Sequence, residues 1–296
     1  MDFVNLAREG KNNWWRYVLA VFTILFIWFG VSIVVFMLLF AFVLFDNNPE
    51  TRPDTATGQI VGVDPLITFV VIMLSAAALF AAVLIAVRLF HQRPARSLIT
   101  PLARVDWKRI AVGFGFFFLL GMLGSIVEGL LFPGRYQLTF KPDEFFKFMP
   151  FVLILIPIQT TGEELLFRAY LLQSFGLLFR RPFIAAVVSS FIFMLLHLAN
   201  PEVSADAILL PAYYFCVGIL FSLVTLKDGR LELALGAHAA VNIFSALGAN
   251  YTVSALATPS LFTVTTLDAG FSFAAFVITA IVFYAGLFWR RPIQRA

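Results

Sequence analysis

Eight long apolar runs, separated by short polar breaks, constrain the fold of this chain more than any other feature of its sequence. A helix needs about 20 apolar residues to cross the hydrocarbon core of a bilayer. The breaks hold Pro, Asn, Asp, Gly and charged residues, which are typical of turns. The runs cover residues 17–45, 65–90, 110–132, 148–179, 182–199, 207–226, 231–249 and 261–289. We therefore predict an all-α, polytopic membrane protein, a bundle of about eight transmembrane helices.

Composition supports a membrane environment and argues against a soluble or nucleic-acid-binding protein. Of the 296 residues, 61% are hydrophobic and 13% are charged, whereas soluble domains hold about 25% charged residues. The formal net charge of +4 would suit a nucleic-acid partner. However, the basic residues are spread between the apolar runs and form no dense patch. We therefore expect the lipid bilayer as a partner and no nucleic acid.

The basic residues also predict the topology. With the N-terminus in the cytoplasm, sixteen of the 21 Lys and Arg residues fall in five cytoplasmic segments and four in outer loops, while Arg168 lies within a run. Cytoplasmic loops are enriched in Lys and Arg, so this distribution predicts an even number of spans and two cytoplasmic termini. We expect an integral protein of the bacterial inner membrane. Residues 5–17, which include Trp14 and Trp15, are predicted to lie along its cytoplasmic surface.

Charged side chains inside the apolar runs are the next informative feature, because each costs at least about 2.5–3.5 kcal/mol in hydrocarbon. The fourth run holds Glu163, Glu164 and Arg168. Glu164 and Arg168 are four residues apart, so they share a helix face and can form an ion pair. That pair leaves Glu163 as an uncompensated carboxylate, suited to act as a general base. The alternative is a structural salt bridge between helices, which does not require a second Glu.

Two later runs each carry a histidine paired with a second side chain on one helix face. Phe193 and His197 are four residues apart in the fifth run, as are His238 and Asn242 in the seventh. Each pair taken alone is explained by packing or by a hydrogen bond between helices. Together with the acids, they supply a base for water, imidazoles to orient it or hold a metal, and an amide for an oxyanion. Peptide hydrolysis requires these parts.

The ordered motifs Glu-Glu-x-x-x-Arg, Phe-x-x-x-His and His-x-x-x-Asn resemble the CPBP family, the CAAX proteases and bacteriocin-processing enzymes also called the Abi family. The resemblance covers residues 150–250 and implies an eight-helix intramembrane endopeptidase. Its substrate would be a peptide or a membrane-anchored protein. The chain then divides into N-terminal membrane helices with three spans and a cytoplasmic loop (1–145), a CPBP-like catalytic core (146–252), and a C-terminal span with its tail (253–296). All three parts belong to a single integral membrane domain.

The resemblance also implies roles for individual side chains. It implies that Glu163 activates water with help from His197. The oxyanion is assigned to His238 and Asn242, and the remaining two residues support the site. The implied catalytic set is Glu163, Glu164, Arg168, His197, His238 and Asn242.

Metal dependence stays open in the sequence. Many bacterial members of the family are named metalloproteases, with Glu and His as zinc ligands. Glu163, His197 and His238 would make a three-ligand zinc site with an open position, or they act without a metal. The zinc motif His-Glu-x-x-His does not occur, because none of the three histidines is followed by Glu.

Two other functions fit a membrane bundle of this kind. The chain could be a catalytically inactive scaffold or immunity protein of the same fold, although such a protein need not keep Glu163 or His238. It could also be a proton-coupled transporter in which Glu128 and Glu163 relay protons. The paired broken helices that mark many transporters are not evident in the sequence. Glu128 has no evident partner, and its role stays open.

Overall fold

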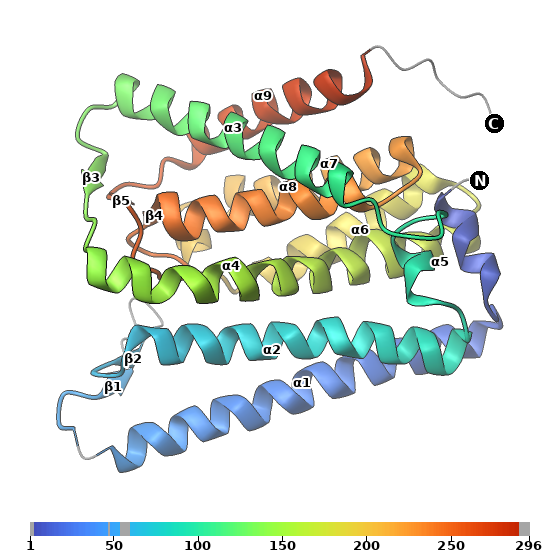
Figure 1. The fold of residues 1–296 in the computed structure, drawn as a ribbon, viewed down its shortest axis with the longest axis horizontal. Coiled ribbons are helices and arrows are strands. Elements are labelled where there is room, and N and C mark those ends of the chain that lie inside the picture. The colour runs from blue at the N-terminus through green and yellow to red at the C-terminus, as the bar shows by residue number, and fades with distance from the viewer. Residues whose placement is uncertain (1–2, 47, 54–59, 290–296) are drawn as a thin grey trace.

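The computed structural model describes residues 3–46, 48–53 and 60–289, and helices dominate this part of the chain (Figure 1). The α-helices are Trp14–Phe45 (α1), Pro65–Ala86 (α2), Trp107–Leu131 (α3), Pro142–Glu164 (α4), Leu172–Phe179 (α5), Pro182–His197 (α6), Leu209–Asp228 (α7), Glu232–Ile243 (α8) and Ala269–Phe288 (α9). The shorter 3₁₀ helices are Phe3–Glu9 (η1), Ala95–Leu98 (η3) and Pro201–Ala205 (η5). The predicted basic tail with Arg290, Arg291 and Arg295 lies outside the described residues.

Three π-helical segments extend α-helices without a break. They are Val87–His91 (η2) after α2, Leu165–Leu171 (η4) after α4, and Phe244–Gly248 (η6) after α8. Because η4 joins α4 to α5, these three elements form one continuous helix, Pro142–Phe179, of 38 residues. This helix fills the fourth predicted run and carries three of the predicted site residues.

The described helices match the predicted all-α membrane fold. Six of them are long and apolar enough to cross a membrane. The other two predicted runs hold α6, of 16 residues, and α8, of 12 residues. α6 ends at His197, three residues before Asn200, and the proline at position 201 disfavours helical geometry in the residue before it. Each of the eight predicted runs therefore contains an α-helix, but two of these helices are short.

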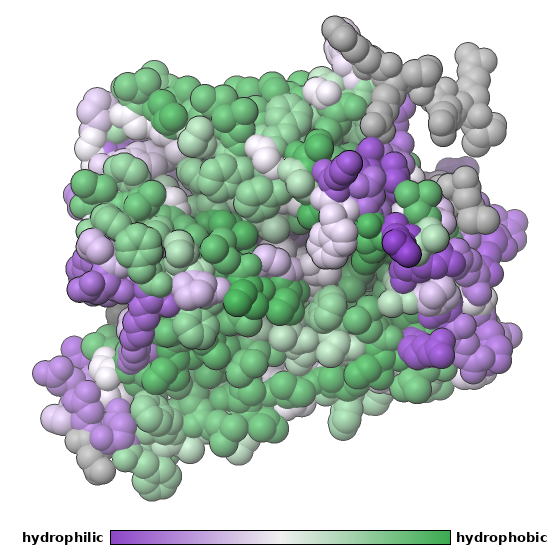
Figure 2. Space-filling view, viewed as in Figure 1, coloured by the Kyte–Doolittle hydropathy of each residue, from purple (hydrophilic) through white to green (hydrophobic). Residues whose placement is uncertain are grey.

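The surface agrees with insertion in a bilayer. Figure 2 shows apolar residues as a broad belt around the helices and hydrophilic residues gathered at the two ends of the bundle. Phe26 in α1 is 72% exposed, and Leu130 in α3 is 76% exposed. So much exposed apolar surface is typical of a lipid-facing protein. The chain is an integral membrane protein, and α1 begins at the same end of the bundle at which α9 ends (Figure 1).

The helices pack in a continuous series. α1 packs on α2, α2 on α4, α4 on α8 and α8 on α3, while α6 and α7 pack on each other and α7 contacts α8 and α9. α3 and α8 approach closely through Gly113 and Gly236, where an added Cβ would collide with the backbone of the other helix. His238 follows Gly236 by two residues, about 200° round the helix, and so faces away from α3. This packing directs His238 towards α4.

Two small sheets lie at the end of the bundle opposite the start of α1 (Figure 1). One pairs Arg52–Pro53 (β1) antiparallel with Ile60–Val61 (β2). In the other, the central strand Phe262–Val264 (β5) pairs antiparallel with Tyr136–Leu138 (β3) and parallel with Ala249–Tyr251 (β4). The second sheet ties the connection between α3 and α4 to the segment between α8 and α9.

The N-terminal segment differs in part from its prediction as a membrane-surface anchor. η1 packs against α5, and its side chains Phe3 and Leu6 are completely buried. Trp14, by contrast, is 77% exposed at the start of α1. The apolar residues of η1 therefore belong to the protein core, and the exposed tryptophan remains available to the membrane interface.

Candidate active site

One cavity of about 520 Å³ brings together residues from distant parts of the chain. Its lining includes residues of β3, β4 and β5, so it extends towards the end of the bundle that carries these strands. Four of the six predicted site residues line it: Glu163, His197, His238 and Asn242. The other two, Glu164 and Arg168, are fully buried and do not line it.

Glu163 presents a carboxylate to this cavity from the last turn of α4. Gln159, one turn earlier, donates a hydrogen bond from Nε2 to Glu163 Oε1 at 2.6 Å. The second oxygen, Oε2, is buried and has no hydrogen-bond partner. Among the described residues, its ion-pair contact is with His238, and no Lys or Arg lies within that range. Glu163 is therefore the uncompensated carboxylate that the sequence predicts.

Glu164 and Arg168 form the predicted ion pair. Arg168 Nη1 lies 3.0 Å from Glu164 Oε1, and both side chains are 0% exposed. The guanidinium also lies over the ring of Phe193 in α6, with Cζ 4.0 Å from the ring centroid. A buried charge pair depends on its remaining contacts, because each ion has lost its hydration. Here the pair connects the α4–η4 helix with α6.

His238 lies between the two adjacent acids. Its Nδ1 is 2.8 Å from Glu164 Oε1, and its Nε2 is 3.6 Å from Glu163 Oε2. Because a carboxylate paired with arginine only accepts hydrogen bonds, Nδ1 carries the proton of the neutral ring. The lone pair of Nε2 then faces Glu163. Each of the two consecutive Glu residues of α4 therefore faces a different ring nitrogen of His238.

His197 is the last residue of α6 and also lines the cavity. Its Nδ1 is 2.8 Å from the carbonyl oxygen of Phe193, which can only accept, so Nδ1 is the protonated nitrogen. The ring packs between two aromatic side chains, Phe193 at 4.2 Å and Tyr214 at 4.5 Å between ring centroids. Nε2 of His197 is therefore a free acceptor in the neutral ring.

Asn242 and Gln159 join α8 to α4. Asn242 Nδ2 donates to Gln159 Oε1 at 3.0 Å, and the amide of Gln159 in turn donates to Glu163. The second N–H of Asn242 is left for another acceptor. Gln159 was missed by the sequence reasoning, although a Gln four residues before Glu163 in an apolar run was a usable signal.

A second group missed by the sequence reasoning is Asn200, Glu202 and Tyr214, which also line the cavity. The Tyr214 hydroxyl donates to Glu202 Oε1 at 2.6 Å, and Asn200 Nδ2 donates to the same oxygen at 3.2 Å. The first two residues fall in the break between two apolar runs, where polar residues are ordinary. The sequence therefore carried no signal for this group.

The three predicted zinc ligands do not form a metal-binding group in this structure. Among the described residues, no set of three or more His, Cys, Asp or Glu side chains is arranged to hold a metal ion. Glu163 and His238 lie close together, but His197 does not join them as a third ligand. The donor set as arranged does not fit zinc.

Glu128, whose role the sequence left open, has partners at the far end of α3. Its carboxylate accepts from Arg135 Nη1 at 3.2 Å and from the Tyr136 hydroxyl at 2.8 Å. Arg135 also donates to Asp268 at 2.8 Å. The backbone N–H of Phe271, and then Arg135, hold the pKa of Asp268 below its ordinary value. Glu128 therefore belongs to an ion-pair network that joins α3 to the start of α9.

Two comparisons with known proteins give matches to this chain. A family model described as "Type II CAAX prenyl endopeptidase Rce1-like" matches residues 145–244, which contain all six predicted site residues. The chain is also similar to the uncharacterized protein YyaK of Bacillus subtilis (strain 168). The two are 33% identical over 282 residues, which cover 94% of this chain and 92% of YyaK. No solved structure matches the chain.

Proposed function

The chain belongs to the CPBP family of CAAX proteases, and from this premise we propose that it is an intramembrane endopeptidase. The observation that carries the proposal is the environment of Glu163. One of its carboxylate oxygens is held by Gln159, and the other faces His238 Nε2 at 3.6 Å on the wall of a cavity. A carboxylate in such a setting is suited to take a proton from water.

The attacking water is proposed to bind between Glu163 and His238. Glu163 Oε2 is an acceptor, and so is His238 Nε2 when the neutral ring carries its proton on Nδ1. The two atoms are 3.6 Å apart, which allows one water to donate to both. Such a water keeps its lone pairs free to attack a peptide carbonyl carbon. His197, whose Nε2 is also an acceptor in the same cavity, is proposed to assist this water.

In the proposed reaction, Glu163 first takes a proton from water and later returns it to the leaving amine. As the water oxygen bonds to the carbonyl carbon, its proton passes to the Glu163 carboxylate. When the C–N bond of the tetrahedral intermediate breaks, the same proton passes to the leaving amine. General acid–base catalysis of this kind contributes about 10²–10⁴-fold to the rate.

Asn242 is proposed as the donor to the oxyanion. Its amide nitrogen gives one N–H to Gln159 and has a second N–H for the substrate oxygen. The family resemblance assigns the oxyanion to His238 as well. However, Nε2 of His238 carries a lone pair as long as Nδ1–H donates to Glu164. The contacts therefore favour Asn242 for the oxyanion and His238 for the water.

Glu164 and Arg168 are proposed to support the site from behind the cavity wall. Arg168 pairs with the Glu164 carboxylate, and Glu164 then fixes both the tautomer and the ring plane of His238. Zinc held by Glu163, His197 and His238 remains the alternative. It requires His197 to move towards the other two ligands.

The substrate is proposed to be a peptide or a membrane-anchored protein segment that enters the cavity from the end of the bundle carrying β3, β4 and β5. With both termini in the cytoplasm of a bacterial cell, as the basic residues predict, this end faces away from the cytoplasm. Cysteine-labelling of intact cells with an impermeant reagent, at Thr139→Cys near the strands and at Glu9→Cys near the N-terminus, tests this orientation.

Cleavage of a peptide library by the purified protein in proteoliposomes tests the function. Glu163→Gln keeps the size of the side chain and removes the base, so kcat is expected to fall by about 10²–10⁴-fold. The matched control is Glu144→Gln on the same helix, whose side chain is 55% exposed outside the cavity and which should cleave like the wild type. A chelator is added in a parallel series, and metal-free catalysis predicts no loss.

Four results would contradict or redirect the proposal. Undiminished cleavage by both Glu163→Gln and His197→Ala would end it. Loss of activity with chelator, restored by zinc, would favour the metal alternative. A folded wild type that cleaves no peptide or anchored segment would favour an inactive scaffold or immunity protein. If that protein instead moved protons in a Glu163-dependent way, it would be a transporter.

A further inference from the structure

Glu202 occupies a position between two parts of the cavity wall that are far apart in sequence. It lies in η5, just after the end of α6. Its Oε1 accepts from the Tyr214 hydroxyl in α7 and from Asn200 Nδ2, which also donates to the Tyr214 oxygen at 3.1 Å. We call Asn200, Glu202 and Tyr214 the Glu202 clamp.

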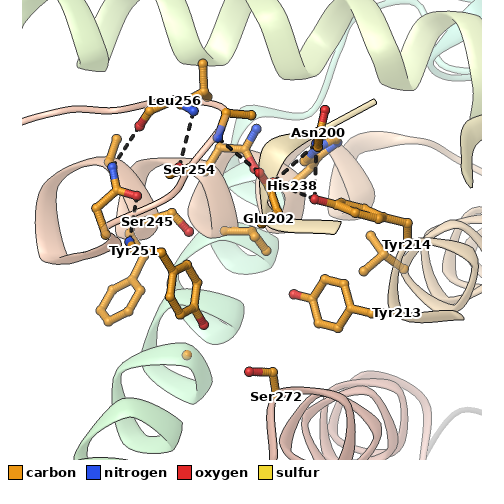
Figure 3. Close-up of a pocket in the computed structure, with 18 of the residues that line it drawn as sticks. Asn200, Glu202, Tyr213, Tyr214, His238, Ser245, Tyr251, Ser254, Leu256 and Ser272 are labelled. Carbon is orange, nitrogen blue, oxygen red and sulfur yellow. Dashed lines mark hydrogen bonds between the residues drawn. The ribbon is translucent and has the colours of Figure 1, made fainter. Parts of the chain in front are cut away.

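The other oxygen of Glu202 holds the segment between β4 and β5. The backbone N–H of Ala255 donates to Glu202 Oε2 at 3.1 Å. Ser254, Ala255 and Leu256 all line the cavity. Figure 3 shows Glu202 between Asn200 and Tyr214 on one side and the chain near Ser254 on the other. One carboxylate therefore binds both α7 and the segment of residues 252–258.

The clamp also reaches the proposed active site through an aromatic contact. The Tyr214 ring packs against the His197 ring, with centroids 4.5 Å apart and planes inclined by 34°. His197 ends α6, and its carbonyl oxygen accepts from the backbone N–H of Asn200, a residue of the clamp, at 3.1 Å. Its ring orientation depends on the Phe193 carbonyl, the Phe193 ring and the Tyr214 ring.

We propose that Glu202 is a positioning residue that couples the segment of residues 252–258 to the orientation of His197. The inference rests on the endopeptidase function proposed above. When the segment is bound to Oε2, the carboxylate is held in place and fixes the Tyr214 hydroxyl through Oε1. Tyr214 then holds the His197 ring in its place along the cavity. When the segment moves away to admit substrate, Glu202 loses one of its anchors and the His197 ring gains freedom.

The chemistry of the clamp fits a coupling role better than a simple structural charge pair. Among the described residues, the three donors to Glu202 are all neutral, namely a hydroxyl, a side-chain amide and a backbone N–H. No Lys or Arg in the described part of the chain forms an ion pair with it. Both arms are held by one carboxylate group, so a rotation or displacement of that group on one side changes the hydrogen-bond geometry on the other. Loss of one arm is therefore expected to weaken the other.

The first test measures kcat and KM for cleavage by variants of the clamp. Glu202→Ala cuts both arms and should lower kcat by about 10- to 100-fold, the range for misplacement of a catalytic group by about 1 Å. Tyr214→Phe keeps the ring and cuts only the hydroxyl arm, so a smaller fall in kcat is expected. Ser204→Ala, on the exposed face of the same 3₁₀ helix, is the control and should leave both constants unchanged.

The second test measures coupling directly. In a Cys216→Ala background, which removes the single native cysteine, Val253→Cys reports the accessibility of the segment to a thiol reagent. Glu202→Ala should raise its labelling rate severalfold. Tyr214→Phe added to Glu202→Ala should lower kcat no further, because both changes break the same link. Glu202→Gln, with one acceptor oxygen instead of two, should satisfy only one arm and give intermediate values.

The outcomes separate this inference from the proposed function. The coupling would be overturned if Glu202→Ala kept the wild-type kcat. It would also be overturned if Glu202→Ala and Tyr214→Phe lowered kcat independently, so that their effects multiplied in the double variant. If Glu163→Gln abolishes cleavage at the same time, the endopeptidase function survives that result. If the wild type cleaves nothing, both proposals fail together. Should Glu202→Ala not fold, Tyr214→Phe and Glu202→Gln retain the shape of the clamp and decide the question.

Discussion

Substituting one member of the buried ion pair Glu164–Arg168 should lower the free energy of unfolding more than substituting both members together. In Arg168→Met, the Glu164 carboxylate remains 0% exposed with His238 as its partner. Uncompensated burial of one member of such a pair costs about 3–5 kcal/mol in the free energy of unfolding. Glu164→Gln leaves the guanidinium over Phe193 without its anion, and a cost in the same range is expected.

The double variant Glu164→Gln/Arg168→Met should cost only about 1–3 kcal/mol, because no unpaired charge remains in the protein. The Gln oxygen can still accept from His238 Nδ1, so the loss there is only the difference between a charged and a neutral hydrogen bond, about 1 kcal/mol. The loss of the guanidinium contact with Phe193 accounts for about another 0.5–2 kcal/mol. The coupling between the two substitutions should therefore exceed about 2 kcal/mol.

Equilibrium unfolding in mixed detergent micelles, followed by circular dichroism, measures the free energies of unfolding of the wild type, the two single variants and the double variant. The matched control is the exposed pair Lys141 and Glu144 on the same helix, 3.2 Å apart with side chains 70% and 55% exposed. Lys141→Met and Glu144→Gln should each change stability by less than about 0.5 kcal/mol. Additive effects at the buried pair, with a coupling below about 0.5 kcal/mol, would refute the reasoning.

Three further predictions test other parts of the structure. Gln159→Leu should lower kcat for peptide cleavage by about 10- to 100-fold with little change in KM, because it frees the cavity carboxylate; an unchanged kcat would remove Gln159 from the site. Gly236→Ala should destabilise the protein by about 1–3 kcal/mol in the same unfolding assay, since its Cβ would collide with α3, whereas Gly115→Ala, with open space around it, should not. The lowered pKa of Asp268 stabilises the fold above its unfolded pKa of about 3.9, and this contribution is lost as pH falls through the lower folded pKa. Thermal unfolding between pH 7 and pH 3 should therefore show a smaller acid-side loss for Asp268→Asn than for the wild type, and equal losses would contradict it.

Apolar runs predicted the helices well where lipid or core burial sets their length. α6 was predicted at residues 182–199 and is Pro182–His197. The start of α4 was missed by six residues, because Asp143 and Glu144 make its first turn polar. Acidic side chains are favourable at a helix N-terminus, so a polar first turn is still helical. Hydrophobicity alone cannot detect such an extension.

The segment before α9 shows a second limit. The run predicted at residues 261–289 begins with the strand β5, and the helix starts only at Ala269. A short apolar stretch is compatible with a strand or a helix. The side chain of Asp268 marks the real start, because it accepts from the Phe271 N–H as a helix cap.

The sequence predicted which site residues share a helix face, but not which of their atoms meet between helices. Spacing of four residues placed Glu164 with Arg168, and His238 with Asn242, each on one helix face. Which atoms meet between helices depends on how closely the helices pack. The position of His238 between Glu163 and Glu164 follows from the approach of α8 to α4, and periodicity within one helix does not encode it.

The π-helical segment η4 sets a requirement on chain length. A π turn closes its hydrogen bonds one residue later than an α turn, so deleting one residue within Leu165–Leu171 would let the helix regain α geometry with little rotation of everything beyond it. Inserting one residue there would instead rotate the following helix by about 100°. Tyr170 and Gln173 would then lose their bonds to His91 and Arg93, while the acids before η4 kept their register. In homologues and engineered variants, this stretch should accept exchanges of one apolar residue for another far more readily than insertions.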